Sequence, residues 1–237
     1  MHKKLPNLIP IFEKYEALAA DIDAIFERVR ADFPEAVTCY EGCSDCCHAL
    51  FDLPLVEAAY LNRAFNNAYP HGLERSAILE KADKADRAIH KIKRQAFKAE
   101  KAGQEPGVIL ENLGREKIRC PLLIADTSGQ GAERCALYVR RPLTCRLYGI
   151  PTAIGGQGHT CSLSGFDPGK HYPTVKMEGV YARLASLSLE LARLAESGYS
   201  QIHTVLVPVS MAILTSYDER YFGIGLQTAH SSRGNNA

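Results

Sequence analysis

Four cysteines fall within nine residues near the start of this chain of 237 residues. They belong to the stretch TCYEGCSDCCH and are Cys39, Cys43, Cys46 and Cys47. Because the chain between them is short, their side chains can converge on one centre with little loss of loop entropy, and Gly42 supplies a tight bend. Thiolates are soft ligands that select zinc, copper(I) or iron–sulfur clusters over magnesium or calcium. The stretch therefore predicts a metal site.

The other four cysteines are more widely spaced and lie at Cys120, Cys135, Cys145 and Cys161. The first thirty residues contain basic residues but no uninterrupted apolar core, which is unlike a secretory signal. We therefore expect a cytoplasmic protein. Since stable disulfides are rare in a reducing compartment, the eight cysteines favour metal binding over a disulfide framework.

The overall charge excludes no partner but favours none. The net charge is +1 and the hydrophobic fraction is 46%, so the chain is expected to fold, with no obligatory nucleic acid or anionic membrane partner. The strongest apolar run, 205–214, is far shorter than the roughly 20 residues that span a bilayer. The segment 73–102 carries nine Lys or Arg against five Asp or Glu. This surplus suits an acidic protein partner, although a charge-rich helix is usually a solvated face, and nucleic acid is not expected.

The periodicity of apolar residues predicts a mainly α-helical protein. We expect a single domain over 1–237, built as a helical array with a small β-hairpin and a loop-rich, cysteine-ligated metal centre. Helices are expected at 5–33, 53–65 (with Asp52 as its N-cap), 73–102, 174–196 and 207–217. A hairpin is expected from 120–125 and 134–139, joined by DTSGQGAE, followed by helical turns at 142–149. The Gly- and Pro-rich segment 149–173 reads as a loop, and the tail after His230 as frayed.

The spacing of the cysteines bears on which metal they hold. Structural zinc sites usually show two short Cys/His pairs separated by a modest loop, whereas here 72 residues separate Cys47 from Cys120. Iron–sulfur clusters accept such a distribution, so the spacing favours a cluster, with zinc as the alternative. His48 and His159 lie beside cysteines, but eight thiols already suffice for two four-coordinate sites. The adjacent Cys46 and Cys47 are expected to point apart, toward different metal centres.

Two other chemistries fit the sequence less well. The spacing C-x3-C-x2-C matches radical S-adenosylmethionine enzymes, but no series of strands and helices follows it, and Cys47 interrupts the pattern. A nucleophilic cysteine needs a base and an orienting partner, and no local pattern singles out one cysteine for that role.

Three motifs together resemble the YkgJ-type cysteine-cluster family, whose domains are described as chelating zinc or iron. These motifs are the group at 39–47, the later CPLL, and CALYVRRPLTCRLYG. The resemblance covers about residues 38–162 and leaves out the flanking helices 5–33 and 174–217. In this chain the first spacing is three residues rather than two, and a long helix is inserted between the halves. The matched positions are Cys39, Cys43, Cys46, Cys47, Cys120, Cys135, Arg141, Pro142, Cys145 and Arg146.

The resemblance implies a metal or cluster centre ligated by these cysteines. Cys161 is expected to join them as the fourth cysteine of the second set, which favours a second site or one enlarged shared site. Arg141 and Arg146 are expected to bind at the cofactor, compensating the thiolate charge and donating N–H groups to sulfur. The expected role is redox chemistry, sensing, or delivery of a metal or cluster. The alternatives are a cluster-dependent protein-modifying enzyme similar to flagellin lysine N-methylases, which use S-adenosylmethionine, and a structural zinc protein. No motif in the chain supports S-adenosylmethionine binding.

Overall fold

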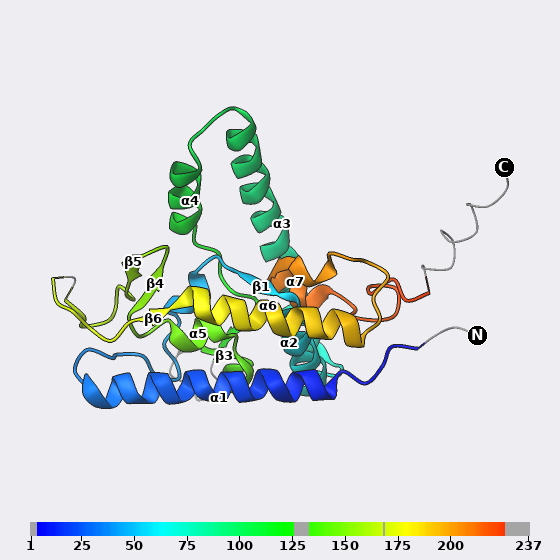
Figure 1. Ribbon diagram of the computed structural model, residues 1–237, viewed down its shortest axis with the longest axis horizontal. Helices are drawn as coiled ribbons and strands as arrows, with labels where there is room; N and C mark the ends of the chain where they lie inside the picture. The colour runs from blue at the N-terminus through cyan, green and yellow to red at the C-terminus, as the bar shows by residue number, and fades with distance from the viewer. Residues whose placement is uncertain (1–3, 126–132, 168, 226–237) are drawn as a thin grey trace.

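A computed structural model describes residues 4–125, 133–167 and 169–225 and confirms a mainly helical fold (Figure 1). None of the helices in these ranges is long and apolar enough to cross a bilayer. The segment DTSGQGAE, apart from its last residue, and the tail after His230 lie outside the described residues. The helices are α1 (Ile9–Asp32), α2 (Leu55–Ala68), α3 (Leu73–Lys101), α4 (Pro106–Arg115), α5 (Leu143–Leu147), α6 (Met177–Leu194) and α7 (Val209–Leu214).

Short strands form three small sheets, and one of them joins parts of the chain that are distant in sequence. Leu53 of β1 stands opposite Val207 of β7, and Leu123 of β2 stands opposite Cys135 of β3, in two antiparallel pairs. A three-stranded sheet has the order β5-β4-β6, with β4 and β6 parallel. The strands are β1 (Asp52–Pro54), β2 (Leu123–Ala125), β3 (Glu133–Cys135), β4 (Thr152–Ile154), β5 (Gln157–His159), β6 (Val175–Lys176) and β7 (Leu206–Pro208).

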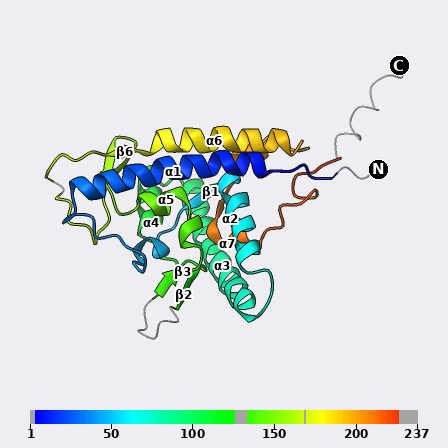
Figure 2. The same cartoon turned by 90° about the horizontal axis from the view of Figure 1, so that it is seen from below.

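The largest hydrophobic cluster lies between α1 and α6, which run side by side in both views (Figures 1 and 2). The buried residues of α1 recur at three- and four-residue steps, which places them on one face of the helix. The sequence predicted this stripe, and the observed helix begins a few residues later than expected. Its buried residues are Ile11, Phe12, Tyr15, Leu18, Ala19, Ile22, Phe26 and Val29.

Helix α2 is buried on two sides and connects two hydrophobic clusters. Leu55 and Tyr60 belong to the cluster against α1 and α6, whereas Leu61 and Phe65 belong to a second cluster against α3 and α7. Burying a side chain such as Phe65 contributes about 1.5–3 kcal/mol to folding. The position of α2 therefore fixes the segments that precede and follow it.

Three local predictions differ from the structure. Asp52 is not the N-cap of α2, because it lies in strand β1 and its carboxylate accepts a hydrogen bond of 2.7 Å from Lys93. The segment 149–173 is not all loop, since β4 and β5 form a hairpin within it. Helix α4 was not predicted; it lies beside the outer half of α3, and together they stand away from the body of the molecule (Figure 1).

Candidate metal centre

The first cysteine segment folds as a turn followed by one short helical turn. Gly42 has a φ of 113°, and the Cys43 N–H donates to the Tyr40 carbonyl at 3.1 Å. A positive φ of this kind suits glycine best because it has no Cβ. A 3-10 turn follows over Asp45–His48, in which the Cys47 N–H donates to the Ser44 carbonyl at 3.0 Å. This turn places Cys46 and Cys47 side by side.

Backbone hydrogen bonds bring the second group of cysteines to the first. The Cys120 N–H donates to the Cys47 carbonyl at 2.6 Å, and the Ile118 N–H donates to the His48 carbonyl at 3.1 Å. Cys135 is attached to the same region through the pairing of β2 with β3. Helix α5 supplies Cys145. Segments 72 residues apart in sequence therefore meet at one place.

Seven of the eight cysteines line a single cavity of about 60 Å³. The remaining wall is largely apolar and includes Ala85 and Ile89 of α3 as well as Val209 of α7. An apolar wall lowers the local dielectric and strengthens the interactions of any charge within it. The cysteines that line the cavity are Cys39, Cys43, Cys46, Cys47, Cys120, Cys135 and Cys145.

Cys46 lies at the centre of these thiols. Hydrogen bonds from Cys145 and from Cys47 to its sulfur hold the pKa of Cys46 well below its usual value. The same hydrogen bonds, together with burial, raise the pKa values of Cys47 and Cys145. The expectation that Cys46 and Cys47 point apart is wrong in this structure, because their side chains share a hydrogen bond and line the same cavity. Their assignment to different metal centres stays a prediction.

Burial keeps the surrounding thiols protonated. It raises the pKa of Cys39 to about 11 and that of Cys120 to about 12, and it also raises the pKa of Cys135. Within the described ranges, no three Cys, His, Asp or Glu side chains are grouped as they would be around a metal ion. The structure thus shows thiols gathered in one cavity but hydrogen-bonded to one another, rather than arranged around a common point.

Cys161 lies outside this cavity, although it is close to its edge. The Thr38 hydroxyl donates to the Leu163 carbonyl at 2.8 Å, which ties the segment of Cys161 to that of Cys39. The Cys161 thiol donates to Asp45 at 3.4 Å and lines a neighbouring depression together with His159. His48 is not among the residues that line the cysteine cavity.

The two predicted arginines occupy different environments. Arg141 lines the cavity, its guanidinium lies 4.0 Å from the centre of the Tyr138 ring, and its charge acts to lower the pKa values of Cys39, Cys46 and Cys135. Arg146 does not line the cavity and is only 6% exposed. Its guanidinium donates to the carbonyls of Arg141 at 3.0 Å and Val139 at 2.5 Å, and it pairs with Asp23.

A buried carboxyl that the sequence analysis missed holds α5 in place. Glu57 Oε1 accepts hydrogen bonds from the Leu143 N–H at 2.7 Å and from the Tyr15 hydroxyl at 2.8 Å. Burial raises the pKa of Glu57, and these two hydrogen bonds oppose that shift. Because Leu143 begins the helix that carries Cys145, Glu57 positions this cysteine. A single carboxylate within the apolar stretch LPLVEAAYL was the available signal.

Gly149 allows the chain to pass directly against Cys39. A Cβ at this position would lie 2.5 Å from the Cys39 Cβ and 3.3 Å from the Phe26 ring. We expect Gly149→Ala to lower the free energy of unfolding by about 1–3 kcal/mol, because the backbone must shift to relieve the overlap. Urea denaturation measures this change.

Gly179→Ala is the matched control for Gly149→Ala. Gly179 lies within α6, and a Cβ there would have no heavy atom within 4 Å. This substitution should leave stability unchanged or raise it, since alanine is preferred over glycine in a helix. Equal stability of Gly149→Ala and the wild type would contradict the close approach of Gly149 to Cys39.

Comparison with known proteins agrees with this geometry. The profile of the CxxCxxCC family, described as a "Putative zinc- or iron-chelating domain", matches residues 38–162. This range contains all eight cysteines and more than half of the chain. No significant match was found among curated proteins or among solved structures. The chain belongs to the CxxCxxCC family.

Proposed function

We propose that the cavity lined by seven cysteines holds an iron–sulfur cluster, and that the protein uses this cluster in redox chemistry, sensing or cluster delivery. The observation that carries the proposal is the gathering of seven thiols, from four separate parts of the chain, around one cavity. Thiolate sulfur is the usual ligand of iron–sulfur clusters, and such ligands need not be close in sequence. Zinc is the alternative occupant.

The size of the cavity supports a group larger than a single ion. Its volume of about 60 Å³ is several times the roughly 10–15 Å³ that one water-sized sphere needs on the same measure. A four-coordinate zinc ion is enclosed directly by its ligands and leaves no such space.

The donor set fits this group once the thiols lose their protons. Cys46, Cys47 and Cys145 are already in contact through hydrogen bonds, and they form the centre of the proposed ligand set. Cys161 is left out because it lies outside the cavity. Arg141 lines the cavity and would balance part of the thiolate charge, whereas Arg146 would act only by holding the backbone near Arg141. When bound, the cluster supplies one-electron chemistry.

Metal affinity should fall steeply as pH is lowered. The surrounding thiols have raised pKa values and are protonated near neutral pH, whereas the pKa of Cys46 is lowered and its sulfur is ionised. When four thiolates of the metal-free protein bind zinc, about three protons should therefore be released. The affinity for zinc should fall about 1000-fold for each unit by which the pH is lowered. Calorimetric titrations with zinc between pH 6.5 and 8, in two buffers that differ in ionisation enthalpy, measure this release. A titration with less than one proton released would contradict the assigned protonation states.

Reconstitution without oxygen tests the proposed cofactor. Metal-free protein supplied with ferric iron, sulfide and a thiol that reduces part of the iron should develop a brown chromophore that remains with the protein on gel filtration. Zinc added afterwards in equal amount should leave the chromophore in place. If iron and sulfide separate from the protein while zinc remains bound, the cluster proposal is wrong and a zinc protein is the correct reading.

We further propose that residues 1–237 form one domain and that the protein works in the cytoplasm. The first proposal is supported by α2, which contributes buried residues to both hydrophobic clusters. The second is supported by the eight cysteines, all of which are free thiols in the structure.

A further inference from the structure

Six exposed cations form one row along α3, which we call the cationic ridge. Its members are separated by three or four residues, so they fall on one side of the helix. At about 1.5 Å per residue the ridge is about 25 Å long. Its members are Lys84, Arg87, Lys91, Arg94, Lys98 and Lys101.

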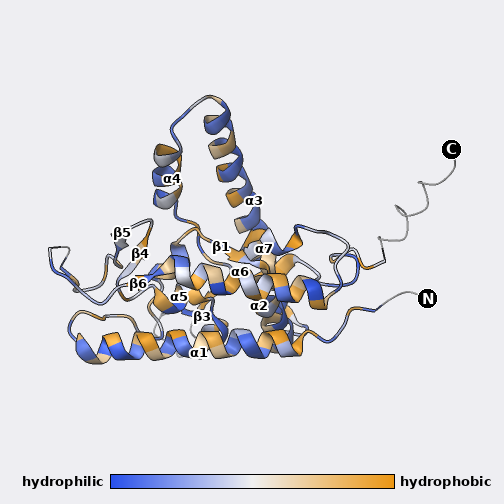
Figure 3. Cartoon of the chain, viewed as in Figure 1, coloured by the Kyte–Doolittle hydropathy of each residue, from blue (hydrophilic) through white to orange (hydrophobic). Residues whose placement is uncertain are grey.

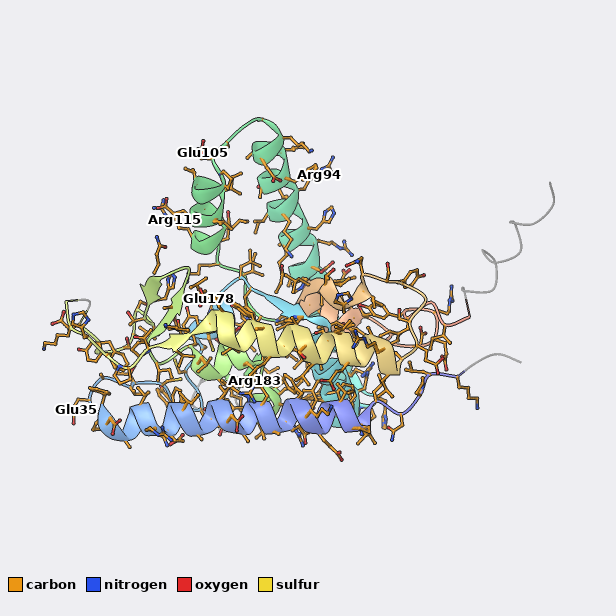
Figure 4. The ribbon with its side chains drawn as sticks, viewed as in Figure 1. Glu35, Arg94, Glu105, Arg115, Glu178 and Arg183 are labelled. Atoms are coloured by element: carbon orange, nitrogen blue, oxygen red, sulfur yellow. The ribbon has the colours of Figure 1, made fainter. Side chains whose placement is uncertain are left out.

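The cationic ridge faces away from the rest of the molecule. The buried residues of α3, such as Ala82 and Ile89, lie on the opposite side of the helix. The side that contains Ile92 and Ala96 faces α4, with which it lines a shallow depression. In Figure 3 the outer part of α3 is mostly hydrophilic, whereas α4 carries both hydrophilic and hydrophobic residues. Figure 4 shows Arg94 on the side of α3 away from α4.

Charge on the outer half of the ridge is not balanced within the described chain. At its inner end, Lys84 pairs with Glu80 at 2.7 Å and Arg87 pairs with Asp83 at 2.5 Å. Within the described residues, Lys91, Arg94 and Lys98 form no ion pair. Over 87–101 the chain has six Lys or Arg and a single acidic residue, Glu100.

The helix dipole explains only part of this arrangement. Cations are favourable in the last turn of a helix, which accounts for Lys98 and Lys101. Lys91 and Arg94 lie farther back, and like charges three or four residues apart destabilise a helix. A row of this kind is stabilised when an anionic surface lies along it.

An exposed aromatic ring beside the ridge indicates the chemistry of that surface. Phe97 is 57% exposed, and the Lys101 ammonium lies 5.4 Å from the centre of its ring. A phosphate backbone offers no apolar contact for such a ring, and one aromatic residue is too few to stack the bases of a single strand. A membrane surface calls for a continuous apolar face, which α3 uses against its own body.

We propose that the cationic ridge binds an acidic amphipathic helix of a protein partner, with Asp or Glu at three- and four-residue steps and one apolar side chain on Phe97. This proposal goes beyond the cofactor assignment and does not depend on it. The partner would lie along a helix that also forms a wall of the cysteine cavity, since Ala85 and Ile89 of α3 line that cavity. The partner would lie on the outer side of α3, whereas the inner side of the same helix lines the cavity.

Fluorescence anisotropy of the full chain with a designed peptide tests this proposal. The probe is a labelled helical peptide of about 21 residues, six turns long, with glutamates at three- and four-residue steps and one leucine beside them. We expect Lys91→Glu/Arg94→Glu/Lys98→Glu to weaken binding at least 20-fold, roughly the loss of three exposed ion pairs and their replacement by repulsion. The neutral variant, with glutamine at the three positions, should lose about 5-fold.

Matched controls separate a specific ridge from general charge. Arg28→Glu/Arg193→Glu/Arg220→Glu changes three exposed cations elsewhere by the same total charge and should weaken binding about 2-fold or less. Phe97→Ala should weaken binding about 3-fold, but only for the peptide that carries leucine.

Three results would overturn the proposal. The first is equal binding of a peptide with the same composition whose glutamates are spread around the helix. The second is equal loss for the ridge and control variants. The third is tighter binding, through the same three cations, of a 20-base-pair RNA duplex or of phosphatidylserine vesicles, which would identify a different class of partner.

Discussion

Replacing Cys145 with serine is expected to remove most of the bound metal from the protein as purified. The Cys145 thiol donates to Cys46 at the centre of the cavity, and α5 holds it there through Glu57. A serine hydroxyl is a hard ligand that does not ionise near neutral pH, so it replaces a soft thiolate poorly. The metal content of Cys145→Ser should be less than about half that of the wild type. Its affinity for the metal should be at least about 10-fold lower. Elemental analysis and a competition titration with a chromophoric chelator measure both quantities.

Cys161→Ser is the control for this experiment because Cys161 belongs to the same family motif region but lies outside the cavity. It should retain the metal content of the wild type. Loss of metal in Cys161→Ser, with retention of metal in Cys145→Ser, would contradict the proposed ligand set. It would mean that the metal binds at the edge of the cavity near Cys39 and Cys43.

Removing the metal is expected to destabilise the centre of the molecule more than Gly149→Ala does. The segments that carry the cysteines have little regular structure, with a four-residue 3-10 turn, three-residue strands and a five-residue helix. Metal bound by such segments contributes directly to folding, with values of about 10–16 kcal/mol in zinc-finger peptides. Here part of that energy is offset by packing against α1 and α2. A net loss of about 5 kcal/mol would lower Tm by about 10–20 °C for a chain of this size.

Differential scanning calorimetry before and after dialysis against a chelator measures this loss. Limited proteolysis should then show new cleavage within 38–48 and 117–145, while α1 and α6 stay protected by their shared hydrophobic cluster. Cys145→Ser, which should already have lost most of its metal, should show a much smaller further change in Tm on chelation. An unchanged Tm in the wild type would mean that the cysteine region is stable without metal.

The long helices could be predicted from the sequence because their apolar residues repeat without interruption. The stripe from Ile11 to Val29 gave α1, and the absence of Gly and Pro from 73–102 gave α3. Helix α4 was missed because it begins with Pro106-Gly107 and contains Gly114, which are turn signals, and because it has no residue that is fully buried. Its helical state depends on its contact with α3, which a local pattern does not reveal.

The hairpin of β4 and β5 was predictable but was not predicted. Gly155 and Gly156 have φ values of 59° and 78° and connect the two strands directly, and two glycines in this place suit the positive φ angles of a two-residue hairpin turn. Two glycines among many in 149–173 were read instead as a sign of loop structure. The pairing of β1 with β7 lay beyond sequence reasoning, since it joins Leu53 to Val207 across most of the chain.

For the candidate site, the sequence identified the chemical groups but not their arrangement. The number and type of thiols predicted metal binding, and the family profile agrees. Which cysteines share a cavity depends on long-range contacts such as the hydrogen bond from Cys120 to Cys47, so the position of Cys161 outside the cavity could not be foreseen. The same holds for Gly149 and Glu57, whose importance arises from contacts with Cys39 and α5.

The content of iron, zinc and acid-labile sulfide in protein purified without oxygen tests the central claim most directly, with the visible spectrum recorded on the same sample. The proposed function predicts iron and sulfide in similar amounts, little zinc, and a brown chromophore that bleaches on reduction. Colourless protein with one or two zinc ions and no sulfide would contradict the cluster, and protein that binds neither metal would contradict a metal centre in the cysteine cavity altogether.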